Sequence, residues 1–263
     1  MLLNPISVHS PKTIQEAARL YKSLPDVKLM AGGTFLLNSL KLLKRKGNKT
    51  ANNVVSLRHI QGLYGISIQD GVLTIGAMTT ISALYECSLL KDNLSILNVV
   101  CKNISTNPIR NMATVGGNLT CRYTWTEMGA VMIALDARMH FVSDQGVDHV
   151  MTAEEFFKAG ARTDKIFSHV TIIHNPLLRV SYQRVKKTMH VDVPLLAVCI
   201  CGQTKDKVFS NVWVSINNGV GFAQRDYLLE AFLKGKAATL ETIEASMNHL
   251  NPEIYDKRSD DYK

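Results

Sequence analysis

The sequence predicts an α+β protein built from more than one structural unit. Near the N-terminus, leucines at helical spacing (36, 37, 40 and 43) follow a short apolar run. Two further apolar runs flank Asp70-Gly71, which is a strong signal for a β-hairpin. Late in the chain, two long β-type runs precede two helical ones. The length of 263 residues is enough for one large domain or two small ones.

The first elements are predicted to form a small N-terminal α/β unit. Thr13 to Glu16 fits a capping box that starts an amphipathic helix, and Pro25 ends this helix. Residues 27–31 are predicted as a short buried strand that leads into Gly32-Gly33 and then into the leucine-containing helix. A strand at residues 54–57 closes the unit.

The middle of the chain is predicted to contain a mainly antiparallel set of strands with helices. Thr79 or Thr80 caps one helix, and another from Leu94 to Ile104 leads to the loop that holds Pro108. Proline forbids a regular helix across that junction and favours an extended Asn107. The other expected elements are strands at 65–68, 72–75, 138–143 and 148–151, and helices at 127–134 and 153–158.

The last part of the chain is expected to form a separate C-terminal unit. Before it, strands at 166–174 and 179–187 are predicted to pair across Asn175-Pro176. Strands at 193–201 and 208–217 and two helices that end near Leu250 then make up the unit itself.

Two separated glycine pairs are the clearest functional signal, one within Ala31 to Thr34 and one, Gly116-Gly117, within Asn107 to Thr120. Glycine tolerates positive φ and lets a ligand approach the backbone, and consecutive amides can bind anionic oxygens. A strand, a glycine turn and a helix also bring a positive helix end near phosphate. Each pair alone also fits an ordinary tight turn, but together they suggest one extended phosphate-bearing ligand. Neither a Gly-x-Gly-x-x-Gly fingerprint nor a P-loop is present.

Four motifs in order give a family resemblance: Lys28 to Thr34, Ile75 to Thr80, Ile109 to Asn118 and Ala134 to Ala137. Together they resemble the FAD-binding (medium) subunit of the molybdenum hydroxylases, a family that includes xanthine, carbon monoxide and nicotinate dehydrogenases. The resemblance implies a two-subdomain FAD-binding fold of the vanillyl-alcohol-oxidase/PCMH type over residues 1–175. Its subdomains would be about 1–55 and 56–175. A small C-terminal α+β domain with a three-stranded antiparallel sheet would occupy 176–263.

The resemblance also implies an FAD site between the two subdomains. The implied cofactor-binding residues are Lys28, Leu29, Met30, Ala31, Gly32, Gly33, Thr34, Phe35, Ile104, Arg110, Thr114, Val115, Gly116, Gly117, Asn118, Glu127, Ile166 and Arg184. Glu127 stands where the family usually has aspartate, and Arg184 where relatives often have lysine. No catalytic acid, base or metal ligand is expected, because the flavin carries the redox chemistry.

Several of these positions also have plain structural interpretations. Lys28 could be a solvated strand lysine, and Arg110 could either contact phosphate or pin its own loop. Glu127 could be a favourable charge in the first turn of a helix. Ile104 and Ile166 fit core packing better than a cofactor contact. Trp125 fits a buried aromatic anchor better than a residue stacked near the cofactor.

The net charge of +8 has its densest cluster at residues 41–49, at the end of a predicted helix with Gly47 as a C-cap. No aromatic residues interleave with these charges, so we expect no nucleic-acid binding. The cluster is interpreted as a solvated helix end or as a patch that meets an acidic partner subunit.

Five cysteines without a regular framework favour a reducing compartment, and Cys199 and Cys201 are expected to be small buried strand residues. The histidines lack metal-binding spacing, and no apolar run reaches the ~20 residues of a membrane span. Without the features of a signal peptide, a cytoplasmic location is expected.

The resemblance implies an oxidoreductase subunit that receives electrons from [2Fe-2S] clusters on a small partner subunit and passes them through FAD to NAD⁺ or another acceptor. A large partner subunit would carry molybdopterin. Two alternatives are an assembly subunit with weak or no FAD binding, and a free-standing flavin oxidase of the same broad fold. Asp256 to Lys263 resembles a family segment that another helix normally follows. Two outcomes are expected: either that helix is dispensable, or its absence alters docking of the partner subunits.

Overall fold

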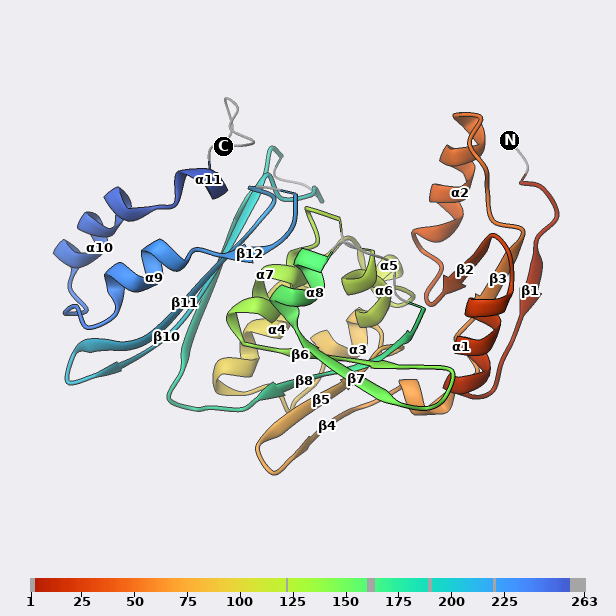
Figure 1. The fold of residues 1–263 in the computed structure, drawn as a ribbon. Helices are drawn as coiled ribbons and strands as arrows, with labels where there is room; N and C mark the ends of the chain where they lie inside the picture. The colour runs from red at the N-terminus through yellow and green to blue at the C-terminus, as the bar shows by residue number, and fades with distance from the viewer. Residues whose placement is uncertain (1–2, 122, 160–163, 189–190, 220, 256–263) are drawn as a thin grey trace.

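The computed structural model describes residues 3–121, 123–159, 164–188, 191–219 and 221–255. Three β-sheets follow one another along an elongated molecule, with the N-terminal and C-terminal units at opposite ends (Figure 1). The α+β class predicted from the sequence is confirmed. The C-terminal segment from Asp256 to Lys263, which resembles a family segment, lies outside the described residues.

The N-terminal unit is a three-stranded parallel sheet in the order β1-β3-β2, with two helices. Its elements are β1 (Ser7–His9), α1 (Ile14–Ser23), β2 (Val27–Met30), α2 (Leu36–Arg45) and β3 (Asn53–Ser56). The hydroxyl of Thr13 accepts a hydrogen bond from the Glu16 amide and so caps α1 as predicted. Only β1 had no sequence signal.

The central unit is a five-stranded antiparallel sheet in the order β4-β5-β8-β6-β7. Its strands are β4 (Ile66–Gln69), β5 (Val72–Gly76), β6 (Arg138–Val142), β7 (Asp148–Thr152) and β8 (Ile166–Ile173). Asp70 and Gly71 both have positive φ, at 50° and 73°, and form the predicted hairpin turn between β4 and β5.

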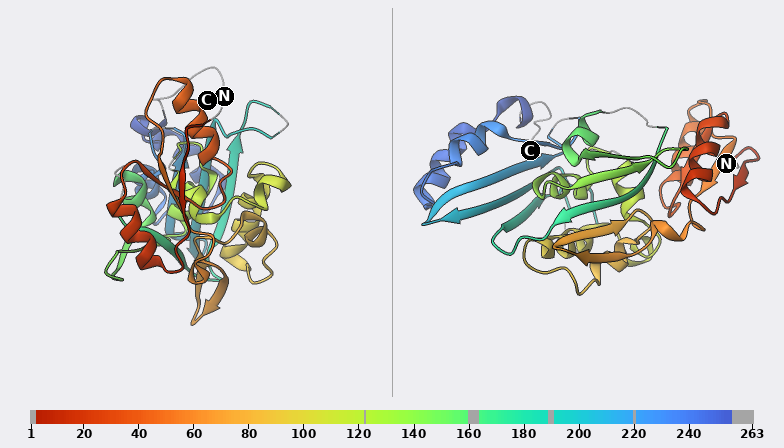
Figure 2. Two further views of the ribbon diagram at one scale, coloured as in Figure 1. Left: turned by 90° about the vertical axis from the view of Figure 1, so that its right-hand side faces the viewer. Right: turned by 60° about the horizontal axis from the view of Figure 1, so that its bottom comes forward.

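Helices cover one face of this sheet (Figures 1 and 2). They are α3 (Ile81–Tyr85), α4 (Ile96–Asn103), α5 (Asn107–Arg110), α6 (Val115–Thr120), α7 (Glu127–Ala134) and α8 (Ala153–Ala159). The prediction of an extended Asn107 is wrong, because Asn107 and Pro108 form the first turn of α5, where the missing proline N–H has no intrahelical partner to lose. Thr106 is the extended residue before it.

The third sheet has the order β12-β11-β10-β9 and is antiparallel. Its strands are β9 (Arg179–Val185), β10 (Leu196–Lys205), β11 (Val208–Asn217) and β12 (Gln224–Arg225), so it has four strands rather than three. The predicted pairing of β8 with β9 is wrong. Both edges of β8 are occupied by β5 and β6, so the chain crosses after Asn175-Pro176 and β9 pairs with β10.

Helix α7 lies between the central unit and the third sheet, and all eight of its residues are buried. It packs against β10 and β11, while α9 (Tyr227–Leu233) packs on β11 and is followed by α10 (Leu240–Ser246) and α11 (Pro252–Tyr255). The Ser215 hydroxyl of β11 donates to the Ala130 carbonyl of α7 at 2.5 Å. One continuous hydrophobic core therefore runs from α1 through the central helices to β10.

Candidate functional site

The first glycine loop joins β2 to α2 and carries free backbone donors. Gly33 has φ +72°, a left-handed conformation that favours glycine. Within the described part of the chain, the backbone N–H groups of Gly32, Gly33 and Thr34 have no hydrogen-bond partner. Three such donors just before a ten-residue helix are suited to the oxygens of a diphosphate.

The two glycine segments, which are far apart in the sequence, touch each other in the fold. A Cβ atom on Gly32 would lie 1.9 Å from the Met112 carbonyl oxygen and 3.1 Å from the Ala113 Cα. A Cβ atom on Gly117 would lie 3.7 Å from the Ala31 Cβ. The structure therefore brings both predicted phosphate-binding segments to one place, and only glycine fits at position 32.

The second glycine segment is not the open turn that the sequence suggested. Gly116 and Gly117 lie in the first half of the short helix α6, with negative φ, and Thr114 caps this helix through the Gly117 amide. Its four first amides already donate within the chain: Val115 to Thr79 O, Gly116 to Ala77 O, Gly117 to Thr114 Oγ1 and Asn118 to Thr114 O. Gly116 serves close packing, because a Cβ there would lie 2.7 Å from the Ala77 carbonyl.

This segment nevertheless offers one polar group to a ligand. The side-chain oxygen of Asn118 is buried and has no hydrogen-bond partner within the described residues. A buried, unpaired acceptor is costly unless something binds it. Its place in the first helical turns after the glycine contact makes it a candidate partner for a ligand hydroxyl or amine.

Positive charge concentrates around the first glycine loop. Residues 27–69 contain seven Lys or Arg residues and no Asp or Glu. Lys28 is exposed on β2, which ends at the loop. This local excess of positive charge, in which Lys49 pairs with Asp26, favours an anionic ligand and speeds its approach.

Arg110 is buried and is used to hold its own loop. One guanidinium nitrogen donates to the carbonyls of Lys102, Ile104 and Ser105 at 3.3, 2.8 and 3.1 Å, and the other donates to the side-chain oxygen of Asn107. Ser105, at the bend that these bonds fix, has a positive φ of 49°. Of the two interpretations of Arg110, these contacts support loop pinning rather than a phosphate contact.

We expect Arg110→Ala to lower the free energy of unfolding by about 3 kcal/mol, because three carbonyls lose a charged donor. Urea denaturation followed by circular dichroism measures this change. Arg138→Ala is a matched control with an expected loss of about 0.5 kcal/mol or less, since the Arg138–Asp136 pair is exposed. Unchanged stability of Arg110→Ala with lost FAD affinity would instead indicate a phosphate contact.

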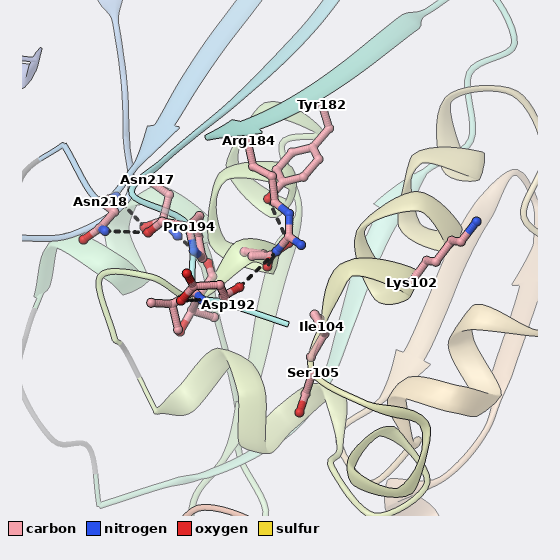
Figure 3. A network of polar contacts seen from close by, with 12 residues as sticks. Lys102, Ile104, Ser105, Tyr182, Arg184, Asp192, Pro194, Asn217 and Asn218 are labelled. Atoms are coloured by element: carbon pink, nitrogen blue, oxygen red, sulfur yellow. Dashed lines mark hydrogen bonds and ion pairs between the residues drawn. The ribbon is translucent and has the colours of Figure 1, made fainter. Parts of the chain in front are cut away.

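Glu127 and Arg184, the two departures from the family pattern, pair with each other. Their side chains are only 6% and 11% exposed, and one guanidinium nitrogen of Arg184 donates to Glu127 Oε1. The hydroxyl of Tyr182 donates to Glu127 Oε2 at 3.1 Å (Figure 3). Burial raises the pKa of the Glu127 carboxyl, and Arg184 and Tyr182 oppose that rise. Sequence reasoning missed Tyr182, although its spacing of two from Arg184 places both on one face of a strand.

The remaining candidates differ in their surroundings. Ile166 is completely buried in the main core, which supports its packing interpretation. Trp125 is 39% exposed, so its interpretation as a buried anchor is wrong. Its ring stacks on the ring of Tyr123 with the two centroids 4.4 Å apart. The Tyr123 ring in turn meets the Phe35 ring at a tilt, with a centroid distance of 4.7 Å. This aromatic row, which the sequence did not reveal, joins the first glycine loop to the segment before α7.

Other features of the described residues lie apart from this site. A pocket of about 290 Å³ beside the β4–β5 hairpin is lined by Tyr64 and His169 among others and contains none of the predicted cofactor residues. In the same parts of the chain, no cluster of His, Cys, Asp and Glu is arranged to hold a metal ion. Cys199 and Cys201 are fully buried on β10, as predicted. No helix in the described ranges is long and apolar enough to span a membrane.

Comparison with known sequences adds to this geometry. The family model "FAD binding domain in molybdopterin dehydrogenase" matches residues 4–176. The xanthine dehydrogenase FAD-binding subunit of Escherichia coli O157:H7 is 32% identical over 145 residues, which cover 55% of this chain and 48% of that protein. The nicotinate dehydrogenase FAD-subunit of Eubacterium barkeri is 24% identical over 259 residues, covering 94% of this chain and 86% of the relative. The match to the first of these relatives thus spans about half of its length.

Solved structures show the same fold. A carbon monoxide dehydrogenase from Hydrogenophaga pseudoflava superimposes with a TM-score of 0.87 at 24% identity, over 95% of this chain and 87% of the other. Quinoline 2-oxidoreductase from Pseudomonas putida 86 gives 0.82 at 22% identity, over 98% and 93%. Since the family model covers most of the chain, this protein belongs to the family that carries the FAD-binding domain of molybdopterin dehydrogenases.

Proposed function

We propose that this chain binds FAD between its N-terminal and central units and serves as the electron-transfer subunit of a molybdopterin-dependent dehydrogenase. The observation that carries the proposal is the contact between the two glycine segments, beside three unpaired amides at Gly32 to Thr34. The proposed FAD-binding domain is residues 1–175, with subdomains of about 1–55 and 56–175, and residues 176–263 form the C-terminal domain.

The residues present fit the cofactor. The amides of Gly32, Gly33 and Thr34 would hold the diphosphate, and Lys28 would add positive charge beside it. Asn118 would accept a hydrogen bond from the adenosine portion through its unpaired oxygen. Near the other unit, Ile104 and Arg184 would meet the flavin rings. Bound FAD would supply the ability to take up electrons one at a time and release them in pairs.

The partners follow from the same proposal. A small subunit with [2Fe-2S] clusters would donate electrons, a large subunit would hold molybdopterin, and NAD⁺ or another acceptor would receive the electrons. The relatives named as xanthine dehydrogenase FAD-binding subunit and carbon monoxide dehydrogenase medium chain support this assignment. The basic cluster at residues 41–49, in which Lys49 pairs with Asp26 and Lys44 donates to Asn4, would lie toward an acidic surface of a partner.

Visible absorption of the purified chain, after incubation with FAD and removal of the excess, tests the proposal. We expect about one FAD per chain, identified by chromatography after denaturation. No retained flavin, either alone or with the two partner subunits added, would refute FAD binding and favour an assembly role. The assembly role is supported by the second glycine segment, because its first four amides already donate hydrogen bonds within the chain.

A further inference from the structure

Tyr182 is not one of the predicted cofactor residues, but it bonds to one of them, Glu127. Tyr182 is two residues from Arg184 on β9, so both side chains leave the strand on the same face (Figure 3). Both side chains bond to Glu127, the first residue of α7. One carboxylate oxygen of Glu127 accepts from the buried Tyr182 hydroxyl and the other accepts from Arg184. The Glu127 carboxylate, on helix α7, is therefore held between two donors from strand β9 of the third sheet.

Among the residues that the structure describes, partners of Arg184 bond to one of its nitrogens. That nitrogen donates to Glu127 and, at 3.5 Å, to the Asp192 carbonyl. Within the described ranges, Nε and the second terminal nitrogen have no partner. Because the guanidinium is a rigid plane, gripping one nitrogen fixes the direction of the others. A lysine, with one compact ammonium, lacks this division between a held edge and a free edge.

Arg184 of β9 bonds to the first residue of α7, and α4 packs beside both of these elements. Helix α4 ends at Asn103, just before Ile104, and packs against both α7 and β9. The Ile104 carbonyl accepts a hydrogen bond from Arg110, and the next residue, Ser105, has a positive φ. The end of α4, the start of α7 and β9 thus meet around Arg184.

We propose that Tyr182 is a positioning residue of the FAD site: its hydroxyl holds Glu127 in the orientation that grips one edge of Arg184 and presents the other edge to the polar rim of the flavin. This inference rests on the proposed FAD-binding function and adds a residue to it. Tyr182 itself does not touch the cofactor. Its effect on binding passes through Glu127.

Within the network, burial raises the pKa of the Glu127 carboxyl, so its charge depends on its two donors. The groups that act on it are Arg184, Tyr182 and Lys186, while Cys101 of α4 lies within range of its charge. Burial raises the pKa of Tyr182 and raises that of Cys101 to about 12, so both stay protonated. Burial likewise raises the pKa of the Cys199 thiol on β10, beside Tyr182. Loss of the Tyr182 hydroxyl removes a hydrogen bond that keeps the Glu127 pKa down, so Glu127 is neutralised at higher pH.

The test measures FAD affinity of the full chain by quenching of flavin fluorescence at pH 6, 7 and 8, for wild type and Tyr182→Phe. We expect Tyr182→Phe to bind FAD about tenfold more weakly than wild type, the effect of one hydrogen bond to a charged group, and the difference to shrink as the pH rises. Glu127→Gln should be weak at every pH. Tyr85→Phe removes a partly buried hydroxyl elsewhere and should match wild type throughout.

Each result bears on a different claim. Wild-type affinity of Tyr182→Phe at all three pH values overturns the positioning role, whether or not Glu127→Gln binds weakly. A uniform loss that does not recover at pH 8, together with a lowered Tm, also overturns it, since that pattern indicates general destabilisation. If wild type itself binds no FAD, the proposed function fails and this inference fails with it; if wild type binds, only the role of Tyr182 is judged.

Discussion

Gly32→Ala is expected to abolish retention of FAD and to lower the free energy of unfolding by about 3 kcal/mol, near the upper end for an overpacked site. The added Cβ would lie 1.9 Å from the Met112 carbonyl oxygen and 2.7 Å from its carbon. Both contacts are with backbone, which cannot rotate away as a flexible side chain can. The two glycine segments would be forced apart at the point where the unpaired amides of Gly32 to Thr34 lie.

Gly62→Ala provides the matched control. Nothing lies within 4 Å of the Cβ that alanine would add there, and Gly62 is outside both glycine segments. We expect a change in unfolding free energy of less than about 1 kcal/mol and FAD content near that of wild type. Equal flavin retention by wild type and a folded Gly32→Ala protein would show that the junction of the loops does not hold the cofactor.

Arg184→Met is expected to lower the free energy of unfolding by about 4 kcal/mol at pH 7, because it leaves the buried Glu127 carboxylate without its partner. Methionine preserves the length and apolar volume of the side chain. The measurement is urea denaturation of the full chain, with the midpoint and the slope fitted separately.

The loss should depend on pH in a defined direction. Burial raises the folded-state pKa of Glu127 above its ordinary value of 4.5, so its contribution to stability is greatest below that value and is lost as the pH rises through the raised pKa. Arg184 holds this pKa down. Its removal shifts the pKa upward and extends the loss toward neutral pH. Arg184→Met should therefore become less stable, relative to wild type, between pH 5 and pH 7.

A double variant isolates the pair. Glu127→Gln combined with Arg184→Met removes both charges and should be more stable at pH 7 than Arg184→Met alone. A loss in Arg184→Met that is the same at pH 5 and pH 7, or a double variant no better than the single one, would contradict the importance of this buried ion pair.

Local sequence signals were enough for most elements. The Thr13 and Thr80 caps, the Asp70-Gly71 turn and the helical leucines of α2 are confirmed, because each depends on residues within one or two turns of chain. The family motifs also lie in short contiguous segments, so the order of these motifs was visible without a structure. The α+β class and the FAD-binding family therefore followed from the sequence.

Contacts between distant segments could not be obtained in this way. The sequence paired β8 with β9, yet β9 joined the third sheet because both edges of β8 were already filled by β5 and β6. Gly116 looked like a flexible turn residue, whereas close packing against Ala77 is what requires it. Edge occupancy and packing depend on the whole fold, and no local pattern encodes them.

The site shows the same division. The sequence by itself indicated two glycine segments for a phosphate-bearing ligand, and its family resemblance added Glu127 and Arg184 as candidate FAD ligands. Only the tertiary structure decided that Gly32 meets Met112, that Arg110 pins its own loop, and that Glu127 binds Arg184 across 57 residues of chain with Tyr182 behind it. The reason is physical: a buried charge is costly unless an opposite charge lies beside it in the folded chain. That partner can come from any distant segment, so the spacing of residues in the sequence does not predict it.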